Sequence, residues 1–136
     1  MHHLQRNPPA MNESLPLLKL QSVMPGQPES DRPKSERLLQ GNPRRDTWNC
    51  VDADLDGSRL YCGVWRCEPG HWRIEMAAGE HELFTVLQGR CRVHREDGTF
   101  QEAGAGEAIY IPAGFRGSFE VLEAVTKTYA IVATQT

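Results

Sequence analysis

Apolar residues recur at every second position over much of the chain after residue 47. Trp72, Ile74 and Met76 alternate with two charged residues, and a similar alternation runs through residues 90–94. A period of two is that of a β-strand with one buried and one solvated face, because successive side chains point to opposite faces. The segment 83–87 is apolar at all but one position and predicts a strand that is buried, or nearly buried, on both faces.

Short strands separated by turns predict an all-β domain. Residues 108–112 and 129–133 are two further short apolar runs. Asp97-Gly98 follows one predicted strand, and both residue types accept the positive φ of a hairpin turn. No segment after residue 47 has the apolar period and the caps of an amphipathic helix. The pattern therefore predicts a small β-sandwich or barrel.

The N-terminal third differs in composition from the rest of the chain. Seven of the nine prolines lie in the first 43 residues, whereas all ten aromatic residues follow residue 47. Proline removes a backbone donor and restricts the residue before it, so residues 1–43 are predicted to form an extended or partly disordered arm ahead of a folded domain at 44–136. Within the arm, the leucine-rich segment 14–23 is predicted to pair as an edge strand, on the sheet of a partner subunit. A disordered tail is the alternative.

Composition and charge exclude several classes of protein. A net charge of −3 without a basic run argues against nucleic acid or an anionic membrane as the main partner. No apolar run approaches the roughly 20 residues of a membrane-spanning helix. Four cysteines are too few for a disulfide scaffold, so we expect a cytoplasmic protein. A hydrophobic fraction of 39% favours a homodimer in which a second subunit helps to bury the strands.

Two turn clusters have more specific spacings. Gly89 follows Glu82 after six residues, and Pro112-Ala113-Gly114 follows Gly106 after five. These clusters resemble the Glu-x6-Gly half of the first cupin motif and the Gly-x5-Pro-x-Gly half of the second. The resemblance implies a small single-domain cupin, which is an RmlC-like double-stranded β-helix or jelly-roll barrel. The chemistry agrees, because glycines form the corners of such a barrel and Pro112 ends a strand where no backbone donor is needed.

The flanking sequence resembles one cupin subfamily more closely. The similar segments are Gly63-Val64-Trp65, Pro69-Gly70-His71-Trp72-Arg73-Ile74, Ile111-Pro112-Ala113-Gly114-Phe115-Arg116-Gly117 and Val121-Leu122-Glu123. They are similar to the cupin domain named after (S)-ureidoglycine aminohydrolase, and the similarity covers about residues 36–133. The resemblance to this family does not by itself imply its activity, because that chemistry depends on the family's metal ligands.

The expected metal ligands are missing. Many cupins hold a metal through two histidines and a glutamate of the first motif and a histidine of the second. In this chain the two histidine positions of the first motif fall at Met76 and Ala78, or one residue earlier at Glu75 and Ala77, and that of the second falls at Gly117. None of these is a histidine, and only Glu82 keeps its family residue. One carboxylate cannot supply the three or four ligands of a transition metal. We therefore expect no metal or other cofactor in the barrel.

The remaining histidines and cysteines show no ligand spacing. His71, His81 and His94 lie in a turn or on hairpin strands and are predicted to be ordinary surface residues. Cys62 and Cys67 have no second pair beside them, so two buried thiols are predicted rather than a zinc site.

Glu82 is the centre of a candidate pocket. It is expected to point into the barrel, where an unpaired carboxylate is costly and needs a cation. The matching family positions imply that Lys127 or Arg116 supplies it. Tyr129 lies two residues beyond Lys127 and shares its face of the strand. The complete expected pocket is Trp72, Glu82, Arg116, Phe119, Lys127 and Tyr129, with the two aromatic residues as walls.

Two functions fit these residues. One is the binding of a small polar metabolite without metal. The other is an enzyme that acts on a small nitrogenous metabolite, a ureide or an amine, with Glu82 as general acid and base and with Lys127 and Tyr129 orienting the substrate. A buried Glu–Lys pair that only stabilises the barrel interior is the structural alternative. The sequence leaves all three open.

Overall fold

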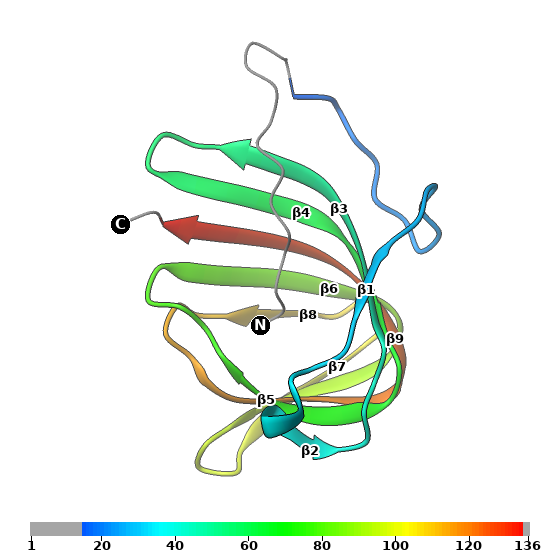
Figure 1. The fold of residues 1–136 in the computed structure, drawn as a ribbon, viewed down its shortest axis with the longest axis vertical. Helices are drawn as coiled ribbons and strands as arrows, with labels where there is room; N and C mark the ends of the chain where they lie inside the picture. Colours follow the sequence, from blue (N-terminus) through cyan, green and yellow to red (C-terminus); the bar gives the residue numbers. More distant parts are fainter. Residues whose placement is uncertain (1–14, 135–136) are drawn as a thin grey trace.

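The computed structural model describes residues 15–134, which are almost entirely β-structure (Figure 1). Within these residues no helix is long and apolar enough to span a membrane. The prediction of an all-β domain is confirmed. The elements are β1 (Glu29–Asp31), the 3₁₀ turn η1 (Ser35–Arg37), β2 (Leu38–Gln40), β3 (Arg45–Asp54), β4 (Ser58–Cys67), β5 (Gly70–Glu75), β6 (Glu80–Arg95), β7 (Phe100–Gly104), β8 (Ala108–Ile111) and β9 (Arg116–Thr134).

Two long strands, β6 and β9, organise the sheet. They pair antiparallel along most of their lengths, with register shifts between Val86 and Cys91. On its other edge, β9 pairs with β4 and then with β5, and β3 and β2 extend the sheet beyond these two strands. β7 and β8 pair with successive parts of β6. The strands therefore curl into a half-barrel around one core (Figure 1).

Residues face the core largely as the alternation predicts, with one exception. Over residues 72–76 the apolar side chains are buried and the charged ones are exposed. The strand at 83–87 is buried on one face only: Phe84 and Val86 lie in the core, whereas Leu83 is 53% exposed. The prediction of two buried faces is wrong because, within residues 15–134, no second layer covers the convex face of β6 there.

The segment ahead of residue 44 contributes to the sheet. β1 pairs with β3, and β2 pairs with β5. Residues 15–23 form no strand, so the expected edge strand at 14–23 is not found within this subunit, and residue 14 lies outside the described residues. Pairing with a partner subunit stays a prediction. The arm also contacts the sheet at Gly26, whose carbonyl oxygen accepts a 3.1 Å hydrogen bond from the indole of Trp48 on β3.

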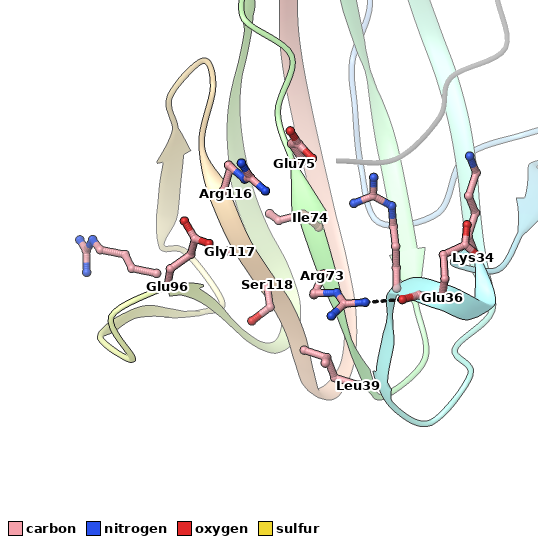
Figure 2. Close-up of a pocket in the computed structure, with 12 residues that line it drawn as sticks. Lys34, Glu36, Leu39, Arg73, Ile74, Glu75, Glu96, Arg116, Gly117 and Ser118 are labelled. Carbon is pink, nitrogen blue, oxygen red and sulfur yellow. Dashed lines mark hydrogen bonds between the residues drawn. The ribbon is translucent and has the colours of Figure 1, made fainter.

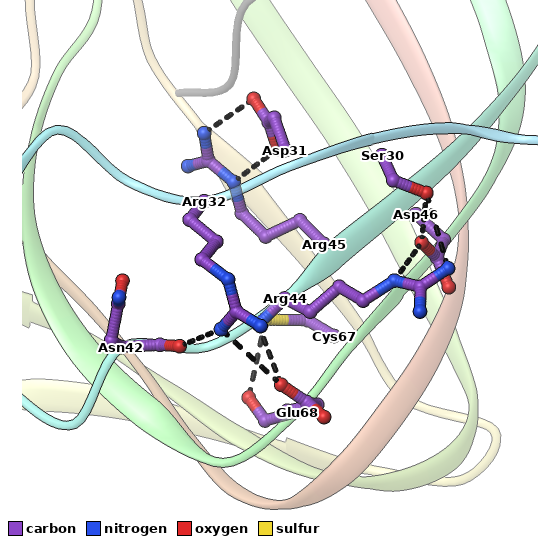
Figure 3. A network of polar contacts seen from close by, with 9 residues as sticks. All are labelled: Ser30, Asp31, Arg32, Asn42, Arg44, Arg45, Asp46, Cys67 and Glu68. Carbon is purple, nitrogen blue, oxygen red and sulfur yellow. Dashed lines mark hydrogen bonds and ion pairs between the residues drawn. The ribbon is translucent and has the colours of Figure 1, made fainter.

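An arginine-rich network fastens β1 to the sheet (Figure 3). The guanidinium of Arg45 is buried and forms two hydrogen bonds with the Asp31 carboxylate, of 2.8 and 2.7 Å. Arg44, the residue before it, is exposed and pairs with Asp46 at 3.0 Å. Glu68 accepts a 2.7 Å hydrogen bond from the backbone N–H of Arg44. The Arg45–Asp31 pair is bidentate, and its planar fork fixes both distance and angle.

We expect Arg45→Met to lower the free energy of unfolding by about 2 kcal/mol, because charge-assisted hydrogen bonds of this kind contribute about 1.5–3 kcal/mol. Arg44→Met is the matched control, and its exposed ion pair is worth about 0–1 kcal/mol. Urea unfolding followed by circular dichroism measures both values. Equal losses in the two variants would contradict a special role for the buried arginine.

The four cysteines are free thiols and differ in accessibility. Burial raises the pKa of Cys67 to about 12 and that of Cys91 to about 11. Cys50 and Cys62 are only half-buried, so the predicted burial holds for Cys67 and not for Cys62.

Because the thiolate is the reactive form, iodoacetamide at pH 8 should alkylate Cys50 and Cys62 first and leave Cys67 and Cys91 unmodified until the protein unfolds. Peptide mass spectrometry of the native and the denatured protein checks this order. Modification of Cys67 at the same rate as Cys62 in the native protein would show that the core opens readily.

Candidate functional site

The centre of the half-barrel holds a buried ion pair. Glu82 on β6 and Lys127 on β9 both point to the concave face, and the Lys127 Nζ atom donates a 2.8 Å hydrogen bond to Glu82 Oε2. Both side chains are fully buried. A buried charge of either sign is tolerated only with a partner, so each residue accounts for the presence of the other.

Three aromatic rings surround the ammonium group. Lys127 Nζ lies 4.4 Å from the ring centre of Trp65, 4.1 Å from that of Phe84 and 4.9 Å from that of Phe119. These distances are within the range of cation–π attraction, which grows when the cation is removed from water. Burial nevertheless lowers the pKa of Lys127 from its ordinary value, and the Glu82 carboxylate opposes this effect. The negatively charged Glu82 therefore stabilises the protonated form of Lys127.

The second oxygen of the Glu82 carboxylate differs from the first. Glu82 Oε1 is buried and accepts no hydrogen bond from the described residues, and the indole N–H of Trp72 likewise finds no acceptor among them. Trp72 belongs to the same aromatic cluster, with its ring centre 5.4 Å from that of Phe119. A buried polar atom without a partner costs about 1–3 kcal/mol. Within residues 15–134, Glu82 Oε1 is thus a free acceptor and the Trp72 indole N–H a free donor.

The predicted pocket residues do not all converge. The structure pairs Lys127 with Glu82, and it places Trp72 and Phe119 in the aromatic cluster. Tyr129 shares the face of Lys127, but its hydroxyl donates a 2.7 Å hydrogen bond to Asn49 Oδ1, and burial raises its pKa. Asn49 was not predicted, because its approach to Tyr129 depends on the pairing of β3, β4 and β9.

Arg116 lies elsewhere, in a surface groove of about 570 Å³ (Figure 2). It is exposed and stands opposite Glu75 in the β5–β9 register. The prediction that it belongs to the interior pocket with Glu82 is wrong because it begins β9, eleven residues before Lys127, on the outside of the sheet. The groove mixes both charges and so has no single ligand preference: its charged residues are Lys34, Arg37, Arg73, Arg95, Arg116, Glu36, Glu75 and Glu96.

The interior does not fit the metal site found in many cupins. Met76 is buried and has only a thioether, and Ala78 is exposed and has no ligand atom. At Gly117 a Cβ atom would lie 2.0 Å from the His94 carbonyl oxygen and 2.9 Å from the Phe115 ring. A histidine at that position therefore has no room, and the described residues leave Glu82 without a second metal ligand from these positions.

Solved structures with the same fold come from several bacteria. The chain superposes on a protein of unknown function from Pseudomonas syringae pv. tomato with a TM-score of 0.70 and 21% identity, covering 82% of this chain and 46% of that one. It therefore spans about half of that protein. A putative ethanolamine utilization protein Q from Salmonella typhimurium has a TM-score of 0.57 and 23% identity, covering 67% and 71%. EutQ from Clostridium difficile has a TM-score of 0.56 and 21% identity, covering 76% and 80%.

At these identities the structures support the fold alone. No curated protein matches the sequence. The cupin superfamily expected from the two motifs is confirmed, whereas the matching family model is described by EutQ and not by ureidoglycine aminohydrolase. That model, the EutQ-like cupin domain, covers residues 56–129, which is more than half of the 136-residue chain, and the protein therefore belongs to this family.

Proposed function

We propose that the barrel binds a small neutral polar molecule against Glu82, without the usual cupin metal. The observation that carries this proposal is the free Oε1 atom of Glu82. Its other oxygen is held by Lys127, so the carboxylate is fixed in orientation and presents one lone-pair oxygen to the interior. Such preorganisation lowers the entropy cost of binding.

The charge of the site indicates the chemistry of the ligand. Glu82 and Lys127 together are neutral, so a ligand with a net charge would bring an uncompensated charge into an aromatic interior. An amide or urea group has the N–H donor that Glu82 Oε1 lacks and the carbonyl oxygen that the Trp72 indole N–H lacks. Ureides, after which the similar ureidoglycine aminohydrolase domain is named, contain this group. Because the pair is fully covered, the ligand must be small and must displace side chains to enter.

A second candidate function is metal-independent catalysis on the same kind of molecule. Oε1 is the atom able to accept a proton while Oε2 remains bonded to Lys127, so Glu82 has the arrangement of a general base. In this mechanism Lys127 fixes the carboxylate. Product formation from a bound ureide distinguishes this candidate from binding alone.

A thermal-shift series tests the proposal. Methylurea and acetamide are neutral probes, and acetate and ethanolamine are charged probes of similar size. Ligands this small bind weakly, so concentrations on the order of 10–100 mM are needed. We expect the neutral probes to raise the melting temperature of the wild type and the charged probes to have no such effect.

The control variants separate binding from stability. Glu82→Gln should abolish the shift caused by methylurea, whereas Glu102→Gln, which removes an exposed carboxylate on the outer face, should keep it. If no probe raises the melting temperature and Glu82→Gln is simply less stable, the pair has a structural role only. The homodimer also stays a proposal, and light scattering of the full chain and of a variant lacking residues 1–30 tests it.

A further inference from the structure

A second polar cluster lies on the outer face of the half-barrel. His71 on β5 stands opposite Glu120 on β9, and His94 on β6 stands opposite Ser118. The neighbouring residues Trp72 and Phe119 point inward to the core, so the cluster faces away from the Glu82–Lys127 pair. Three adjacent strands thus bring two imidazoles and one carboxylate together.

The geometry of the cluster is close. His94 Nε2 lies 2.8 Å from Glu120 Oε1, and the ring centres of His71 and His94 are 4.9 Å apart. One ligand atom from each of the three residues can be chosen so that all lie within 4.8 Å of one another. The side chains are half-buried, which limits their freedom and keeps a path to solvent.

Two imidazoles and one carboxylate form a recognised ligand set for zinc, with bonds of about 2.0–2.2 Å. Tetrahedral bonds of this length place ligand atoms roughly 3.4 Å apart. The ligand atoms, which lie within 4.8 Å of one another, must therefore move by about 1 Å to bind zinc. Rotations of the side chains supply such movements. The fourth position would remain for solvent or another ligand.

The surroundings support such a site. The hydroxyl of Ser118 is buried and lies 2.7 Å from His71 Nε2, where it orients the ring. Hydrogen bonds of this kind hold metal-binding histidines in place. Two positive charges on this face oppose a cation. Arg92 stands opposite Glu120 in the register but pairs with Glu102 at 2.7 Å. Arg73 stands opposite Ser118 and donates a hydrogen bond to the Glu36 carbonyl oxygen.

We propose that His71, His94 and Glu120 bind a divalent transition-metal ion, with zinc the best match, on the outer face of the barrel. This site is separate from the interior metal site of other cupins, whose positions are Met76, Ala78 and Gly117 here. It is also independent of the ligand proposed for the barrel interior.

Titration calorimetry of the full chain with ZnCl2, after treatment with EDTA and dialysis, tests the proposal. We expect one equivalent to bind. His71→Ala and His94→Ala should each weaken binding about tenfold or more, which corresponds to at least about 1.4 kcal/mol. His81→Gln changes a histidine outside the cluster and should leave binding unchanged. A variant with both His2→Gln and His3→Gln should also retain it and so exclude the N-terminal histidines.

Cobalt provides a spectroscopic readout beyond affinity. Co²⁺ in a tetrahedral protein site absorbs strongly in the visible range, and we expect this band in the wild type and its loss in His94→Ala. Circular dichroism of the metal-free variants checks that they remain folded. Absence of one-equivalent binding in the wild type, or unchanged binding in folded His71→Ala and His94→Ala, would overturn the proposal.

Discussion

Replacing Lys127 by methionine is expected to lower the free energy of unfolding by about 3–5 kcal/mol, because it leaves the Glu82 charge buried without its partner. Glu82 Oε1 already lacks a hydrogen-bond donor among the described residues, and the substitution removes the donor to Oε2 as well. The cation–π contacts with three aromatic rings are lost in the same step. Urea unfolding at pH 7 measures the loss.

Two further variants show whether the loss comes from the unpaired charge. Glu82→Met combined with Lys127→Met should recover most of the stability, since hydrophobic residues of similar volume often replace a buried pair without loss. Arg116→Met removes an exposed cation from the same strand and should change stability by about 0.5 kcal/mol or less. A loss below about 1 kcal/mol in Lys127→Met would mean that water or other groups solvate Glu82.

Gly89→Ala is expected to destabilise the protein by about 2–6 kcal/mol, because it combines backbone strain with a steric clash. Gly89 has a φ of +84°, in the left-handed region that favours glycine. A Cβ atom there would lie 2.1 Å from the Ala124 carbonyl oxygen and 2.8 Å from Val125 Cα, both on the backbone of β9. The residue lies where β6 shifts register against β9, so neither strand can retreat without breaking the pairing.

Gly106→Ala is the matched control for this prediction. Gly106 has a similar φ of +86°, but a Cβ atom there meets nothing within 4 Å. The Gly106→Ala variant should therefore lose only the stability that corresponds to backbone strain, about 1–3 kcal/mol. Thermal and urea unfolding of both variants measure the difference. Equal losses would show that the approach of β9 to Gly89 is not a constraint on the fold.

Most of the features that could be predicted from the sequence depend on the pattern of residues within a single strand. The alternation at 72–76 depends only on which face of one strand is buried, and it is confirmed. The resemblance to cupins and the cost of an unpaired charge predicted Lys127 or Arg116 as the partner of Glu82, and the structure shows that it is Lys127. The Glu82-x6-Gly89 spacing also depends on one strand only, because Gly89 lies where β6 bends and shifts its register.

Features that depend on register between distant strands were not predictable. His71, His94 and Glu120 belong to three strands, and a shift of one residue in either pairing would separate them. The bulges between Val86 and Cys91 set that register, and the alternation of apolar residues does not reveal them. Arg116 was misplaced for the same reason, since the register of β5 and β9 puts it opposite Glu75 at the surface groove.

The central proposal, a neutral ligand at Glu82, is tested most directly by nuclear magnetic resonance of protein labelled with ¹³C at the glutamate carboxyl carbon. The resonance of Glu82 is assigned by its loss in Glu82→Gln, and the wild type is then titrated with methylurea. We predict a saturable shift of the Glu82 resonance, with those of exposed glutamates such as Glu102 unchanged. A Glu82 resonance that stays fixed, or that moves only in proportion with all the others, would contradict ligand binding in the barrel.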